Sequence, residues 1–278
     1  MNTLGFTLLV AAGSLGAGLL GALTGLGGGI VIIPMLTVLF GIDLRYAIGA
    51  SLVSVIATSS GAAAAYVREG FTNIRLGILL EVATTIGALS GAVLAAYVST
   101  SALGVLFGLV LLYTAYAGSR LPEEHLDSDP PDALATRLRL DSTYPALAGP
   151  KAYRVRKIPA GFALMYLAGV LSALLGIGSG AVKVLAMDRA MGLPFKVSTT
   201  TSNFMIGVTA AAGAGVYLHR GYIEPGLAFP VMLGVLGGAM LGARLLSATR
   251  TQVLRRVFTL VVVVLAAEML YKGLTGGL

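Results

Sequence analysis

The sequence predicts an all-α polytopic membrane protein built from two inverted-topology repeats of about five membrane segments each, with short broken helices after glycine clusters. Three observations carry this prediction: an apolar composition, an internal repeat, and a glycine cluster before a short apolar run in each half. Of the 278 residues, 56% are hydrophobic and 11% are charged, and the mean hydropathy is +0.90. Soluble domains carry about 25% charged residues. The chain is therefore expected to reside in a lipid bilayer.

The charged residues are concentrated in one insert. Thirteen of the 31 Asp, Glu, Lys and Arg residues lie in Ser119–Ile158. This divides the chain into a first membrane repeat (1–118), a polar linker (119–158) and a second membrane repeat (159–278). The linker places acidic residues before basic ones and contains several prolines, a composition typical of a loosely ordered connector. No motif supports a regulatory or partner-binding role for it.

Apolar runs define the membrane segments. Most of them approach the roughly 20 residues that cross the hydrocarbon as a helix. Two runs are too short for a straight crossing, and each either re-enters or crosses as part of a broken helix. These are Ile30–Phe40 and Ala181–Met191. The full series is Leu4–Leu23, Ile30–Phe40, Ala47–Tyr66, Leu76–Val98, Ala102–Gly118, Ala160–Leu175, Ala181–Met191, Val197–Leu218, Gly226–Leu246 and Val257–Leu270.

Basic residues decide between these two arrangements. If both short segments cross, there are ten passages, and 14 basic residues face the cytoplasm against three outside. If both short segments re-enter and the linker is again placed in the cytoplasm, 11 basic residues lie inside and six outside. The positive-inside rule favours ten passages in the plasma or inner membrane, with linker 119–158 cytoplasmic and both termini outside. The net charge of +7 is then a consequence of topology and not a sign of nucleic-acid binding.

An internal repeat relates the two halves. A shift of 151 residues aligns Ala17–Ala95 with Ala168–Leu246 without a gap and with 21 identities, among them Thr58 on Thr209. Five crossings per half give the halves opposite orientations. Inverted halves around a midplane site are a recurrent transporter architecture. A scaffold duplication without bearing on activity is the alternative interpretation.

Each half contains a glycine cluster just before its short segment. An unwound glycine backbone exposes N–H groups, and the start of the following helix adds unpaired donors and a partial positive charge, which suit an anion. Close helix packing is the alternative explanation of the glycines. Two copies in register favour substrate binding. The candidate residues are Gly27, Gly28 and Gly29 in the first half and Gly178, Ser179 and Gly180 in the second.

Lys183 adds a charge to the second short segment, where the first half has Ile32. An ammonium at membrane depth costs on the order of 3 kcal/mol on insertion scales unless it snorkels, pairs or faces water. Snorkelling is one interpretation, and a fixed positive charge facing a transported anion is the other. The third segments add polar donors. Ser202, its repeat equivalent Ser51, and Asn203 are the preferred anion-coordinating side chains.

Glu81 is the candidate proton-coupling residue. It lies in the run Leu76–Val98, where the second half has Met232. Burial disfavours the charged form of a carboxylate and so raises its pKa. A carboxylate of this kind can bind and release a proton during transport. Pairing with a basic residue near the inner face is the alternative. H⁺ is therefore the candidate coupling ion.

Other function classes lack the residues they need. The chain has no cysteine and two histidines, so we expect no metal and no cofactor. At membrane depth the chain has no paired aspartates, no His-Glu-x-x-His motif and no Ser–His pair, so we do not expect an enzyme. It has no Gly-Lys-Ser/Thr phosphate loop, so ATP-driven transport would need a separate subunit. An anion-selective channel would share glycine-rich filters but would line a continuous polar pore. A transporter is favoured, and a homodimer is left open.

Several motifs of the chain point to a known family. They are Gly25–Gly29 with Pro34, the spacing to Gly41, the stretch Ala50–Leu52, the corresponding second-half segment Gly176–Gly180 and the Thr-Thr-Thr-Ser-Asn run. At these residues the sequence resembles the sulfite exporter TauE/SafE family of membrane permeases. The resemblance implies transport of small sulfur-containing anions such as sulfite or organosulfonates without ATP hydrolysis. A transporter of other small carboxylates is the alternative. In the second repeat Ser179 replaces the central glycine, Leu185 stands where the first has Pro34, and Lys183 adds a charge, all where selectivity should be set.

Overall fold

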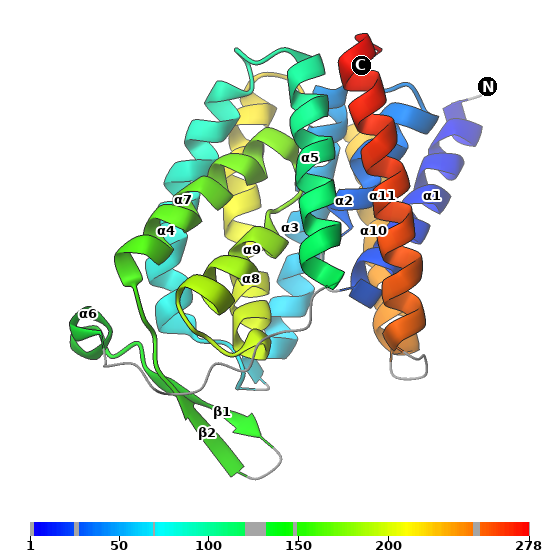
Figure 1. Ribbon diagram of the computed structural model, residues 1–278. Coiled ribbons are helices and arrows are strands. Elements are labelled where there is room, and N and C mark those ends of the chain that lie inside the picture. Colours follow the sequence, from blue (N-terminus) through cyan, green and yellow to red (C-terminus); the bar gives the residue numbers. More distant parts are fainter. Residues whose placement is uncertain are drawn as a thin grey trace.

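The computed structural model describes residues 3–24, 28–68, 70–119, 132–146, 149–246 and 251–277. This part of the chain is mostly helical, as predicted, and Gly27 lies outside it. Long helices run side by side, and two short helices lie among them (Figure 1). The elements are α1 (Thr3–Thr24), α2 (Gly29–Pro34), the π-helix η1 (Met35–Leu39), α3 (Leu44–Arg68), α4 (Ile74–Leu94), α5 (Thr100–Ser119), α6 (Ala133–Arg137), β1 (Ser142–Ala146), β2 (Gly149–Tyr153), α7 (Ile158–Leu175), α8 (Gly180–Leu185), the π-helix η2 (Ala186–Ala190), α9 (Phe195–His219), α10 (Pro225–Leu246) and α11 (Thr251–Thr275).

The same series of elements occurs twice, at the spacing of the sequence repeat. A shift of 151 residues carries α2, η1 and α3 onto α8, η2 and α9 at both ends of each element. The turns between them also correspond. Gly41 and Gly192 have φ of 64° and 72°, and Gly70 and Gly221 have φ of 74° and 75°. This left-handed conformation is unstrained only for glycine, so the repeated glycines are required by the turns.

Helices of the two halves are interleaved. The fourth helix of the first half, α4, packs against α7 and α9 of the second half. Its counterpart α10 packs against α1 and α3 of the first half, while α3 packs on α9 and α5 on α11. Each half therefore completes its core with a helix from the other half, and neither half is an independent unit.

Glycine makes the closest of these contacts possible. A Cβ placed on Gly18 of α1 would collide with the backbone carbonyl oxygen of Val235 on α10, and one on Gly169 of α7 would collide with that of Thr84 on α4. Gly18 and Gly169 are repeat equivalents, as are Val235 and Thr84. Small residues allow such backbone approach where lipid gives no hydrophobic drive for association. The glycine-rich composition thus has a packing role at these crossings.

The helices present apolar side chains outward. On α4, Ile78, Val82 and Ile86 are each more than half exposed, whereas Leu80, Ala83 and Ala88 on the opposite face are buried. An apolar outer face with a small-residue inner face is the pattern of a helix in lipid. Within the described residues, α4 and α7 are both long and apolar enough to cross a membrane, and shorter apolar helices lie at Leu4–Leu20, Gly29–Leu39, Thr100–Tyr116 and Pro225–Leu241.

The polar insert is folded where the structure describes it. Residues 132–146 and 149–157 include α6 and the two strands of an antiparallel hairpin that projects from one end of the bundle (Figure 1). Leu140, Tyr153 and Val155 are buried in one apolar cluster with the first turns of α4 and with η2. The expectation of a loosely ordered connector is therefore wrong for this part, because apolar residues spaced between the charges bury against the helix ends.

A polar contact anchors the hairpin. The amide of Asn73, which caps the start of α4, donates to the Tyr153 hydroxyl at 2.9 Å and to the Leu140 carbonyl at 2.8 Å. Burial raises the pKa of the Tyr153 hydroxyl above its ordinary value. The hydroxyl thus stays protonated at neutral pH.

Candidate functional site

The two glycine clusters lie close together beside α3. A Cβ on Gly29 would lie 3.1 Å from the carbonyl oxygen of Gly176 and 3.3 Å from Val55. A Cβ on Gly178 would lie 3.1 Å from the same Val55 side chain. Gly28 precedes α2, and its carbonyl accepts from the amides of the first turn. The starts of the two short helices are thus brought to one region by the fold.

The predicted serine donors are engaged with this region. The Ser51 hydroxyl donates to the Gly176 carbonyl at 2.7 Å, and the Ser202 hydroxyl donates to the Gly180 carbonyl at 3.3 Å. Both serines are buried, and Asn203 is half-buried. The serine protons satisfy carbonyls at the two ends of the segment Gly176–Gly180, so they must be released before they can bind an anion. Ser51 and Ser202 therefore also hold the glycine backbone in place.

Ser179 is the unsatisfied member of the cluster. It adopts a left-handed conformation with φ of 48°, which a non-glycine residue rarely does. Its side chain is buried, and its hydroxyl has no hydrogen-bond partner among the described residues. A buried polar group without a partner is costly. The strained backbone and the unused hydroxyl make Ser179 a candidate position for contact with a ligand.

Lys183 is fully buried and points to a defined partner. Its exposed fraction is 0%, and its Nζ donates to Thr209 Oγ1 at 2.6 Å. The snorkelling interpretation is therefore wrong, because the ammonium does not reach the surface. Thr209 Oγ1 in turn lies 2.7 Å from Glu81 Oε1. A hydroxyl bridges the two charged groups that the sequence placed on separate helices.

Glu81 is held by hydroxyls from two helices. Thr85 donates to its Oε1 at 3.2 Å, and Thr209 approaches the same oxygen. Oε2 is buried and has no hydrogen-bond partner in the part of the chain that the structure describes. The side chain as a whole is half-buried. Oε1 is thus held by hydroxyl groups, whereas Oε2 can accept a proton or a further hydrogen bond.

This charged cluster joins the two halves and has no repeat-equivalent copy. The repeat equivalents of Lys183 and Glu81 are Ile32 and Met232. Thr58, the equivalent of Thr209, donates to carbonyls of its own helix, those of Ser54 at 3.1 Å and Val55 at 3.2 Å. The two halves share a scaffold but not this chemistry.

The cluster and the glycines are aligned along α9. Ser202 and Thr209 are seven residues apart, two turns on one face of the helix and about 10 Å along its axis. A ligand small enough to touch Ser202 does not at the same time touch the Thr209 hydroxyl. Neither this separation nor the bridging role of Thr209 was predicted from the sequence. The only signal for Thr209 was its identity with Thr58 in the repeat.

Metal chemistry finds no support in this region. Among the residues that the structure describes, no group of three or more His, Asp or Glu side chains could hold a metal ion. The arrangement offers one buried cation, one carboxylate and several hydroxyls. These groups suit an anion and a proton.

Together the apolar outer faces, the interleaved helices and the enclosed charges define a polytopic helical membrane protein with a polar interior. A model of the family described as "Sulfite exporter TauE/SafE" matches residues 9–269. The chain belongs to this family, which locates it in a membrane.

Curated relatives extend over nearly the whole chain. It is 26% identical over 276 residues to the "Probable membrane transporter protein YunE" of Bacillus subtilis (strain 168), covering 97% of this chain and 98% of the relative. The "Probable membrane transporter protein YdhB" of the same organism is 28% identical over 221 residues, covering 79% and 82%. A "Probable membrane transporter protein" of Xylella fastidiosa (strain 9a5c) is 26% identical, covering 96% of each chain. No solved structure matches the chain significantly.

Proposed function

We propose that the protein is a secondary transporter of small anions, with sulfur-containing oxyanions such as sulfite or organosulfonates as substrates. The observation that carries the proposal is the wholly buried ammonium of Lys183 within a membrane protein of the TauE/SafE family. A buried cation at membrane depth faces a substrate, an ion pathway or a partner charge. Relatives described as probable membrane transporters agree with a transport role.

The anion binds near mid-membrane, between the two glycine-rich segments and Lys183. The backbone near Gly28, Gly29, Gly178 and Gly180, together with Ser179, approaches it first, because Gly29 and Gly178 both lie against Val55 of α3. Ser51, Ser202 and Asn203 would supply further donors. Glu81 carries the coupling proton. Ser202 and Thr209 are separated by about 10 Å along the axis of α9, so the proposed anion site is elongated, with Lys183 at one end.

The architecture that we propose is ten passages in two inverted halves, with linker 119–158 cytoplasmic. Two repeat-equivalent contacts support the inversion. Arg45 lies over the ring of Tyr222 at 5.7 Å, and Lys196 lies over the ring of Phe71 at 4.0 Å. Arg45 also donates to the carbonyl of Val98, next to Tyr97.

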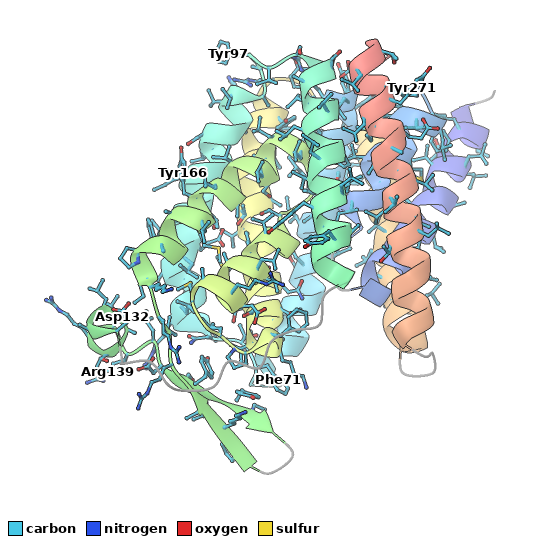
Figure 2. The ribbon with its side chains drawn as sticks, in the orientation of Figure 1. Phe71, Tyr97, Asp132, Arg139, Tyr166 and Tyr271 are labelled. Carbon is cyan, nitrogen blue, oxygen red and sulfur yellow. The ribbon has the colours of Figure 1, made fainter. Side chains whose placement is uncertain are left out.

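The two contacts lie at opposite ends of the molecule. Tyr97 and Phe71 mark these ends in Figure 2. Equivalent contacts at opposite ends are what a two-fold axis in the membrane plane produces. The start of α1 and the end of α11 also lie at the end away from the hairpin (Figure 1), in agreement with termini outside and a cytoplasmic linker.

Transport by purified protein in liposomes tests the proposal. Uptake of radiolabelled sulfite, sulfate, thiosulfate, methanesulfonate and acetate is compared for wild type, Lys183→Met and the matched control Ile32→Met at the repeat-equivalent position. We expect saturable uptake of at least one of the sulfur oxyanions, which Lys183→Met lowers and Ile32→Met leaves unchanged. Uptake that does not saturate with substrate concentration would indicate a channel, and a preference for acetate would indicate a carboxylate transporter. Unchanged uptake by Lys183→Met would refute the site.

A further inference from the structure

The buried charges of Glu81 in the first half and Lys183 in the second half form one neutral unit, which we call the Lys183–Thr209–Glu81 bridge. Thr209 Oγ1 accepts from Lys183 Nζ at 2.6 Å and lies 2.7 Å from Glu81 Oε1. A hydroxyl has a single proton to donate. Glu81 is a nearer acceptor than the Met205 carbonyl at 3.1 Å. The bridge therefore orders the bonds from ammonium to hydroxyl to carboxylate, with charges of +1 and −1.

No other described charge balances either end of the bridge. In the hydrogen bonds that the structure describes, Lys183 and Glu81 are joined through Thr209, and neither contacts another charged group. Of the helices packed against α4, α7 carries one titratable side chain, Tyr166, which is bonded to Ser90 at 3.3 Å. The ionisable residues of α9 are Lys196, Tyr217 and His219 near its two ends, and Asp188 and Arg189 of η2 lie beyond α8.

We propose that the Lys183–Thr209–Glu81 bridge makes transport electroneutral, with one proton accompanying one singly charged anion. This inference rests on the proposed function and specifies its coupling and the charge of its substrate. An anion that approaches Lys183 replaces Glu81 as the counter-ion of the ammonium. The released carboxylate then takes one proton from the aqueous side that supplied the anion, and Glu81 becomes a neutral acid. On release of the anion the proton leaves and the bridge forms again.

Charge neutrality supplies the coupling. The empty site has a net charge of zero, and so does the site with one anion and one proton. Binding of the anion alone leaves −1, and binding of the proton alone leaves +1, in a region where Lys183 is wholly enclosed. An unbalanced buried charge is strongly unfavourable. A dianion leaves −1 even with Glu81 protonated, so the site discriminates against it.

The discriminating experiment uses substrates that carry no proton of their own. Methanesulfonate and methanedisulfonate stay fully ionised through the assayed pH range and differ by one charge. Each is added to proteoliposomes that contain an internal pH indicator, with the membrane potential set by potassium and valinomycin. Wild type should move about one proton per methanesulfonate, independent of potential, and should transport methanedisulfonate at least about tenfold more slowly. Glu81→Gln should move methanesulfonate without protons, and the uptake should then depend on potential.

Matched variants separate the bridge from a general effect on the helix. Thr209→Val removes the bridging hydroxyl and should lower the number of protons per anion, whereas Thr209→Ser should retain it. Thr58→Val, the repeat-equivalent change, should behave as wild type because Thr58 bonds only to its own helix in the described structure. Methanesulfonate uptake without protons in wild type, equal rates for the two sulfonates, or equal effects of Thr58→Val and Thr209→Val would overturn the inference and leave anion transport standing. Absence of any sulfonate uptake would overturn both.

Discussion

Lys183 and Glu81 should depend on one another for the stability of the fold. In the structure the ammonium and the carboxylate share the Thr209 hydroxyl at 2.6 and 2.7 Å. Removing one member of a buried charge pair costs about 3–5 kcal/mol, because the other charge is left unbalanced, whereas replacing both is close to neutral. The bridge therefore predicts that Lys183→Met destabilises the protein.

The two single variants should differ in severity. Glu81→Gln leaves the charge of Lys183, whose side chain has an exposed fraction of 0%, without a counter-ion. Lys183→Met leaves the half-buried carboxylate of Glu81 without one, but this carboxylate keeps its hydrogen bond from Thr85. We expect Glu81→Gln to be the more destabilising, near 5 kcal/mol, and Lys183→Met to lie nearer 3 kcal/mol. The double variant should recover most of the loss. The resulting coupling energy should exceed about 2 kcal/mol.

Reversible unfolding in detergent measures this cycle. Wild type, the two single variants and the double variant are unfolded under identical conditions, and the coupling energy is the deviation of the double variant from the sum of the singles. Ile32→Met serves as the control for a side-chain change at the equivalent buried position, where no charge is present. Additive effects of Lys183→Met and Glu81→Gln would refute the reasoning, because they would mean that the two charges do not stabilise each other.

Three further predictions address packing, the hairpin and topology. Gly238→Ala should destabilise the protein in thermal unfolding, because the added Cβ would collide with the backbone of Leu15. Gly237→Ala on the same helix has open space for its Cβ and should be neutral or stabilising by up to about 1 kcal/mol. Equal effects of the two variants would contradict this packing. Tyr153→Phe should weaken hairpin docking by about 1 kcal/mol and increase proteolysis of the hairpin at neutral pH. Because the pKa of Tyr153 is raised in the folded protein, its hydrogen bond with Asn73 should be fully present below the ordinary tyrosine pKa and be lost only as pH rises through the pKa of the folded state. A Tyr153→Phe variant with the same sensitivity to alkaline pH would contradict this. Ser142→Cys should be shielded from an impermeant reagent in intact cells and Ser99→Cys should react, and the opposite result would reverse the proposed orientation.

Much of the fold followed from local sequence patterns. The glycine turns at Gly41 and Gly192 end the short segments because positive φ requires glycine there, and this requirement is local. The short helices after the glycine clusters were predicted from run length, and the structure has helices of six residues followed by π-turns at both places. The hairpin was not predicted, because its apolar residues are few and scattered among charges, so they give no periodic signal until they meet the end of α4.

The sequence by itself determined the membrane class, the repeat and the unusual residues, because composition, spacing and isolated charges in apolar runs are properties of the chain. Lys183 and Glu81 were both identified in this way. Only the tertiary structure decided that they share one hydroxyl, since α4 crosses to pack against α9 of the other half and brings residues 81 and 209 together. Such a contact depends on how the halves interleave, and helix packing of small residues is compatible with many arrangements until all helices are placed. Ser51 and Ser202 illustrate the same point, because their hydroxyl partners are carbonyls of a backbone that only folding makes available.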